Sequence, residues 1–236
     1  MVEGSLARRQ RRRRQLIDTG SKGVLAYEEL EGLITFQDLK PGSMVSESDL
    51  MSITGLGRSP VREAVQRLAQ ERMVEVHPRR GIVIPLISAE VQLKLLEVRR
   101  SVEELAVRLA SQRVSGSRKS DLLDLAGVLV EGAGDPDLRL YGRRLKEVHR
   151  AIVHSADNEY LHLAMAPLQS ISRRFWFASL ASRQDPTSDL RLAANLHAAT
   201  LRSICENDPE EAARCSSALN DYLTEFTYRT LDRQQR

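Results

Sequence analysis

The sequence contains little of several features that define large classes of protein. It has two cysteines among its 236 residues, and Cys205 and Cys215 lack the spacing of a metal-binding or redox pair. Aromatic residues make up 4% of the chain, too few for a platform that stacks single strands or sugars. No apolar run approaches the ~18 residues of a membrane span, and the first residues lack the apolar stretch of a signal peptide. We therefore expect a cytoplasmic protein that is neither secreted nor inserted in a membrane.

Sequence signatures of catalysis are also missing. The chain has no Gly-x-Ser-x-Gly, no glycine pattern for dinucleotides or phosphates and no His-Glu-x-x-His. We expect no enzymatic activity and no required cofactor, with a metal-dependent enzyme as the remote alternative.

Charge is distributed unevenly along the chain, although the net charge is only +3. The basic N-terminal arm, residues 1–20, holds six arginines against Glu3 and Asp18, and six minus two gives +4. Residues 21–88 hold eight basic and nine acidic residues (−1), and residues 89–236 hold twenty-one of each (0). Two interpretations of the arm stay open: a solvated tail, or a segment that touches phosphates and adds salt-dependent affinity for nucleic acid.

Residues 21–87 show the pattern helix, helix, turn, helix, hairpin. Apolar residues recur at helical spacing, and Ser46 with Asp49 three residues later predicts a capping box at the start of the second helix. The predicted helices cover residues 24–34, a short stretch after Ser46, and Arg58 to about Glu71; the strands cover residues 73–77 and 81–86. This order is typical of a winged helix-turn-helix.

The third predicted helix combines an apolar face with long hydrogen-bond donors. Four apolar residues share one arc at 100° per residue, and an adjoining arc carries Arg58, Ser59, Arg62 and Gln66. Donors near a helix N-terminus can reach guanine edges and phosphates in a major groove. The turn of the hairpin adds Arg79 and Arg80 beside Gly81. An ordinary surface helix is the alternative, but the helices, hairpin and arm together favour DNA binding.

Several motifs in this region resemble the DNA-binding domain of GntR-type bacterial transcription regulators. They are Leu39-Lys40-Pro41-Gly42, Ser46-Glu47, Leu50 and the run from Arg58 to Ala64, within residues 24–86. The resemblance implies that Arg58, Ser59 and Arg62 contact DNA, that Ser46 holds a phosphate and that Arg79, Arg80 and Gly81 form the wing.

The sequence departs from the family pattern at two positions. Gly57 stands where the family usually has a serine cap, so we expect Ser59 to take over the capping. Arg72 stands where the family usually has glycine, which adds a positive charge beside the wing without an obvious cost.

Residues 88–236 change to long amphipathic helices with almost no strand signal, which predicts an all-α antiparallel bundle. The expected helices cover about residues 91–109, 119–131, 138–156, 159–181, 187–206 and 209–232. Three stretches resemble the FCD domain of the FadR subfamily, namely Glu97 to Ala106, Val148 to Asn158 and His197 to Ala212. The resemblance implies an effector-binding and dimerisation domain.

Many FCD domains hold a divalent metal through one aspartate and three histidines. His149 and His197 occupy two of these places, whereas the aspartate place is Leu145 and the last histidine place is Leu219, or Asn220 after a one-residue shift. Two imidazoles without the carboxylate suit such a cation poorly. We predict no tightly held metal; a weakly held divalent ion on His149 and His197 is the alternative.

The resemblance implies instead that Arg99, His149, His197 and Asn220 bind a small anionic effector, with Arg99 gripping a carboxylate in a bidentate manner. Both histidines could equally be satisfied core groups. Arg173 or Arg174 could also face the cavity, but we expect both to be solvated. The predicted function is a homodimeric, sequence-specific regulator, a repressor, that binds an inverted-repeat operator and responds to an organic acid. The alternative is a regulator whose bundle only dimerises.

Overall fold

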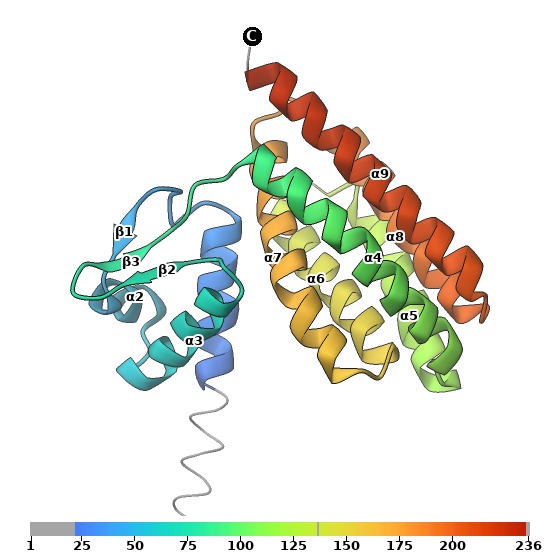
Figure 1. Cartoon of the computed structure of the whole chain (residues 1–236), viewed down its shortest axis with the longest axis horizontal. Helices are drawn as coiled ribbons and strands as arrows, with labels where there is room; N and C mark the ends of the chain where they lie inside the picture. Colours follow the sequence, from blue (N-terminus) through green and yellow to red (C-terminus); the bar gives the residue numbers. More distant parts are fainter. Residues whose placement is uncertain (1–21, 136, 235–236) are drawn as a thin grey trace, which may run out of the picture. The chain divides into compact units, whose positions relative to one another are not determined.

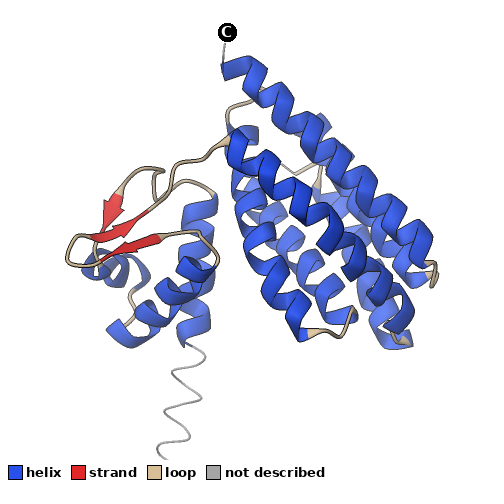
Figure 2. Ribbon diagram, in the orientation of Figure 1, coloured by secondary structure: helices blue, strands red, loops and turns tan. Residues whose placement is uncertain are grey.

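Helices dominate the computed structural model, which describes residues 22–135 and 137–234, so the basic N-terminal arm lies outside the described residues. The chain divides into two compact units between Leu86 and Ile87. One small sheet belongs to the first unit and a helical bundle forms the second (Figures 1 and 2). The predicted mainly α class, with a winged helix-turn-helix and a bundle, is confirmed.

The first unit begins with a helix over residues 22–35 and continues through two helices and a three-stranded sheet. Its further elements are β1 (Met44–Val45), α2 (Glu47–Thr54), α3 (Arg58–Gln70), β2 (Glu75–His77) and β3 (Gly81–Val83). The strands are antiparallel in the order β1-β3-β2. The hairpin strands are shorter than predicted, and β1 was not predicted because two residues carry no periodic signal.

A shared apolar core holds the helices of the first unit together. The apolar face of α3 is buried as its spacing predicts, and apolar residues of the first helix and of the hairpin are buried in the same unit. These core residues are Ala26, Leu30, Ile34, Val61, Ala64, Val65, Leu68, Ile82 and Ile84. The Tyr27 hydroxyl donates to Glu71 at 2.8 Å, which ties the first helix to the end of α3.

Local hydrogen bonds define both ends of the helix-turn-helix. The predicted capping box is present: the Asp49 amide donates to Ser46 Oγ at 3.1 Å, and the Ser46 amide donates to Asp49 Oδ2 at 2.8 Å. At the other end, Arg72 has a φ of 56°. Its amide donates to Ala69, and the next amide donates to Leu68, which is a Schellman ending of α3. Glycine favours this left-handed backbone, so the expectation that Arg72 has no cost here is wrong.

The second unit is a bundle of long helices that begin and end close to the predicted residues. They are α4 (Ala89–Arg113), α5 (Gly116–Gly132), α6 (Leu138–Ser155), α7 (Glu159–Ala181), α8 (Thr187–Cys205) and α9 (Pro209–Gln234). Ser88, Asp137 and Asn158 cap α4, α6 and α7 by accepting bonds from backbone amides. Among the described helices, none is long and apolar enough to span a membrane.

Helix α4 occupies a central place in the bundle, because it packs against α6, α7, α8 and α9. One side of α4 is therefore buried, including the polar residues Gln92, Arg99 and Glu103. Buried polar groups need partners inside the protein, and these partners form the second candidate site.

Candidate functional site

The exposed face of α3 carries the residues that the sequence singled out. Arg58, Ser59, Arg62 and Gln66 are all exposed, while the opposite face packs into the core. The arrangement presents long donors in the first turns of a helix that its apolar side holds in place. The geometry suits a helix that enters a major groove.

The N-terminus of α3 has no side-chain cap. Gly57 is the N-cap residue and Ser59 lies inside the helix, so the expectation that Ser59 caps α3 is wrong. Helical φ and ψ at Ser59 place its hydroxyl beyond the capping position. The consequence is that Ser59 keeps its hydroxyl for other contacts, and the first turn of α3 has no acidic residue.

Ser46 and Arg62 both have partners in the first unit. Ser46 Oγ donates to Asp49 Oδ2 at 2.8 Å, a bond that a phosphate would have to share or replace. The backbone amide of Ser46 lowers the pKa of the Asp49 carboxyl. Arg62 Nε donates to both carboxylate oxygens of Glu47, at 2.8 and 2.9 Å.

The turn of the hairpin projects Arg79 and Arg80, which are both exposed. Gly81 follows them with a φ of 124°, and a Cβ there would lie 3.0 Å from the carbonyl oxygen of Val45. Glycine is therefore required on two grounds, conformation and close approach to β1. Gly81 lets the hairpin turn tightly and so positions the two arginines.

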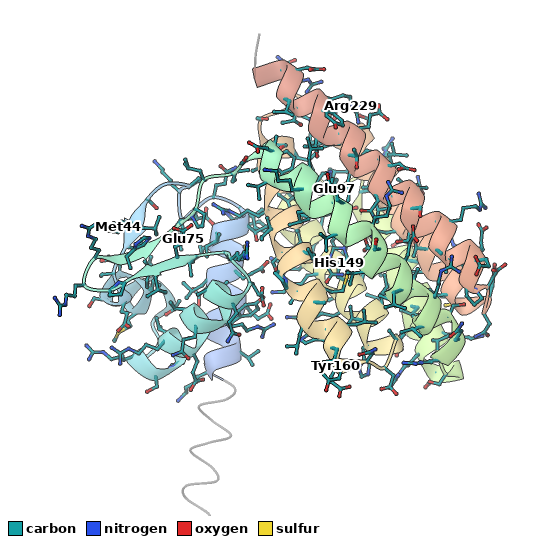
Figure 3. All side chains as sticks on the ribbon, in the orientation of Figure 1. Met44, Glu75, Glu97, His149, Tyr160 and Arg229 are labelled. Atoms are coloured by element: carbon teal, nitrogen blue, oxygen red, sulfur yellow. The ribbon has the colours of Figure 1, made fainter. Side chains whose placement is uncertain are left out.

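A narrow, partly open cavity lies among the helices of the bundle. It brings together residues from α4, α6, α7, α8 and α9, including three of the predicted effector residues, Arg99, His149 and His197 (Figure 3 shows His149 inside the bundle). The lining residues are Arg99, Leu145, His149, Ser172, Arg173, Trp176, Ala193, His197, Leu219 and Leu223.

Arg99 is held by a buried ion pair at the cavity. Its Nε and Nη2 donate to Glu103 at 2.8 and 3.1 Å, and its Nη1 donates to Ser172 Oγ at 2.9 Å. The side chains of Arg99 and Glu103 are each 3% exposed. The Nε/Nη2 edge of the guanidinium therefore already holds a carboxylate, so a ligand would meet the Nη1/Nη2 edge or displace Glu103.

His149 is buried without a hydrogen-bond partner on either ring nitrogen. Burial lowers the pKa of His149 well below its ordinary value, and His197, Arg99 and Arg173 act in the same direction. Burial also lowers the pKa of His197 to about 4, although Glu103 opposes the shift. Both rings are neutral at pH 7, and their centroids lie 5.3 Å apart. An orphaned buried donor and acceptor is costly, and an anionic ligand would accept a hydrogen bond from the ring N–H.

The remaining predicted residues lie around this cavity in different ways. Asn220 Nδ2 donates to Glu103 at 3.2 Å, so Asn220 acts behind the cavity wall, and its Oδ1 is buried with no partner. The expectation that Arg173 and Arg174 are solvated is wrong: each is 5% exposed. Arg173 lines the cavity because α7 is covered on more than one side.

The donor set at the cavity does not fit the metal that many FCD domains hold. Leu145 and Leu219 line the cavity at two of the four expected ligand positions, so apolar side chains stand where a carboxylate and an imidazole would be needed. Among residues 22–135 and 137–234, no cluster of three potential ligands is present. That the protein holds no tight metal stays a prediction.

Sequence reasoning missed Glu103, Ser172 and Gln92, which join Arg99 in one hydrogen-bonded network. The spacing of Arg99 and Glu103, four residues apart on a helix, could have indicated their ion pair. Ser172 and Gln92 lie 80 residues apart in sequence, so only the packing of α4 against α7 brings them together.

Comparison with known proteins gives matches over both units. The family model for bacterial regulatory proteins of the gntR family matches residues 24–84, and the FCD domain model matches residues 94–221. The Nta operon transcriptional regulator of Aminobacter aminovorans is 31% identical over 142 residues, which cover 59% of this chain and 64% of that protein. The chain thus spans less than two thirds of that relative's length.

Two further matches extend over more of the chain. The gluconate operon transcriptional repressor of Bacillus licheniformis is 22% identical over 193 residues, 81% of this chain and 79% of that protein. The solved structure of E. coli McbR/YncC shares the fold with a TM-score of 0.73 at 20% identity, covering 89% of this chain and 98% of that one. The FadR-subfamily resemblance is consistent with this pair of domains. Since the FCD model alone matches more than half of the residues, the chain belongs to the gntR family of bacterial regulatory proteins and carries an FCD domain.

Proposed function

We propose that the protein is a sequence-specific DNA-binding transcription regulator, a repressor, and not an enzyme. The observation that supports this most directly is the exposed face of α3, where Arg58, Ser59, Arg62 and Gln66 stand opposite a fully buried apolar face. The relatives named above as an operon regulator and an operon repressor support the same function. A homodimer would place two α3 helices on an inverted repeat, with Ser46, Arg79, Arg80 and Gly81 at the flanking phosphates and grooves.

The bundle cavity is proposed to bind a small carboxylate that changes DNA affinity. Its partly apolar lining, the guanidinium of Arg99 and the unpartnered N–H of neutral His149 suit such a ligand. The orphaned ring favours this reading over a bundle that only dimerises, because a purely structural core gains nothing from an unpaired buried imidazole. The effector can change the DNA affinity only by the ratio of its own affinities for the DNA-competent and DNA-incompetent states.

A titration of fluorescent DNA from the gene's own upstream region tests the DNA-binding function, with a scrambled duplex at the same salt, about 0.15 M. We expect a preference of roughly 10³ or more for the native sequence; equal, weak binding to both would contradict a specific regulator. Small carboxylates are then screened for release of the DNA. Arg99→Lys keeps the charge opposite Glu103 but loses the fork, so it should abolish release and leave DNA binding intact.

A further inference from the structure

Glu47 and Arg62 form an ion pair that links the two helices of the helix-turn-helix. Glu47 is the first residue of α2, and both of its carboxylate oxygens accept from Arg62 Nε, at 2.8 and 2.9 Å. The two side chains are 39% and 57% exposed. An ion pair this exposed to water contributes little to folding stability. Its main physical effect is on where the guanidinium of Arg62 lies.

The carboxylate of Glu47 is mounted on a rigid base. Ser46 directly precedes it and forms the capping box with Asp49, so the backbone at the start of α2 is fixed by hydrogen bonds on both sides of Glu47. A side chain that leaves a fixed backbone position can restrict the rotamers of its partner. Arg62 loses part of its conformational freedom before any ligand arrives.

The ion pair with Glu47 engages the Nε side of the Arg62 guanidinium and not its Nη1/Nη2 edge. Arginine has five N–H donors in a planar fork, and in the first unit Glu47 engages the donor on Nε. The edge formed by Nη1 and Nη2 stays able to donate two parallel bonds to O6 and N7 of a guanine. A fork already oriented by Glu47 loses less entropy on binding.

The carboxylate of Glu47 does not increase sequence-independent affinity for DNA. Phosphates attract lysine and arginine independently of sequence, and a negative charge beside the exposed face of α3 opposes that attraction. A group that weakens binding to any DNA while orienting a base-reading arginine increases the difference between right and wrong sequences.

We propose that Glu47 is a positioning residue that sets sequence discrimination by orienting Arg62 towards a guanine. This inference rests on the proposed function. When Glu47 is removed, the affinity for the operator falls and the affinity for unrelated DNA does not. Removing a general DNA-binding residue would lower both affinities.

The test compares the ratio of operator to scrambled-duplex affinity in the full-length protein at fixed salt. Glu47→Gln should lower this ratio roughly fivefold to tenfold, part of the discrimination of one bidentate contact, while affinity for the scrambled duplex stays equal or rises about twofold. Glu47→Asp keeps the charge but is one methylene shorter, so it should resemble Glu47→Gln. Glu63→Gln removes an exposed carboxylate from α3 itself and should leave the ratio unchanged.

The Arg62→Ala background decides whether Glu47 acts through Arg62. There, Glu47→Gln should change the ratio no further, and thermal unfolding followed by circular dichroism checks that each variant is folded. If the wild-type protein shows the expected ratio, two results overturn the role of Glu47 but not the proposed function. In the first, Glu47→Gln leaves the ratio unchanged; in the second, Glu47→Gln lowers the ratio by the same factor in the Arg62→Ala background. A wild-type protein without sequence preference overturns the proposed function and this inference together.

Discussion

Arginine serves opposite purposes in the two units of this protein. In the DNA-binding unit, Arg58, Arg62, Arg79 and Arg80 are exposed, and their charges face solvent. In the bundle, Arg99, Arg173 and Arg174 are almost fully buried, and Arg99 is fixed by a carboxylate of its own helix. Exposed arginines are available to a large anionic partner, whereas the buried Arg99 and Arg173 line a small cavity. The same residue type therefore indicates different ligands according to the packing around it.

The largest effect is expected where a buried charge loses its partner. Glu103→Ala should lower the free energy of unfolding by about 3–5 kcal/mol, because Arg99 would remain buried and unpaired. Urea denaturation followed by circular dichroism measures the change. Glu97→Ala, on the exposed side of the same helix (Figure 3), should cost less than about 0.5 kcal/mol. Similar costs for both would mean that the ion pair of Glu103 with Arg99 is not buried as the structure has it.

The histidine pair should make the bundle sensitive to acid. The pKa of His149 is well below 6.5 and that of His197 is about 4, so the unfolded chain binds more protons than the folded one between about pH 6.5 and 4. The free energy of unfolding is therefore unaffected by these histidines above pH 6.5. Below this pH it falls by about 1.4 kcal/mol per pH unit for each histidine.

The His149→Leu variant isolates this contribution. It should reduce the pH slope of the unfolding free energy by about 1.4 kcal/mol per unit, and it should raise stability at pH 7 because an unpaired buried polar group is removed. His154→Gln, at an exposed position of the same helix, serves as the control. An unchanged slope in His149→Leu would mean that the ring is not buried in solution.

Removing one exposed arginine should affect binding and not folding. Arg62→Ala should weaken operator binding by about 1–3 kcal/mol, the discrimination of one bidentate base contact, with little change in the unfolding free energy. Fluorescence titration measures the affinity. Arg191→Ala removes the same charge from an exposed position of the bundle and should leave affinity nearly unchanged. Equal losses would mean that only net charge matters.

The smallest expected effect is a gain of stability in the DNA-binding unit. Arg72→Gly should raise the free energy of unfolding by about 1 kcal/mol, because a left-handed backbone strains a residue that has a Cβ. Thermal unfolding measures the shift. Arg72→Ala keeps the Cβ and removes the charge, so it should give no such gain; stabilisation by both would assign the effect to charge.

Local sequence signals predicted the DNA-binding unit well. The Ser46–Asp49 capping box and the buried face of α3 depend on residues three or four positions apart, which a sequence displays directly. Strand β1 was not predicted, because its two residues are ordered by pairing with β3, about 38 residues away in the sequence. The left-handed backbone at Arg72 was not predicted, because arginine itself does not indicate a positive φ; the glycine that the family usually has at this position was the available signal.

The cavity was predicted less completely, for a physical reason. His149 and His197 were assigned to one site by their motifs, but the burial of Arg173 and the bond from Arg99 to Ser172 depend on how whole helices pack. Amphipathic spacing tells which face of a helix is covered by one neighbour. It does not reveal that α7 is covered on more than one side.

The sheet of the first unit also decides which insertions the fold can accept. β1 pairs with β3 through Val45 and Ile82, and Ser46 begins the α2 cap immediately afterwards. An extra residue between Val45 and Ser46 would pull the start of α2 out of step with the sheet. Extra residues among 78–80 would lengthen the hairpin tip and leave every paired residue in register. The length of the hairpin can therefore diverge between related chains while the helix-turn-helix keeps its geometry.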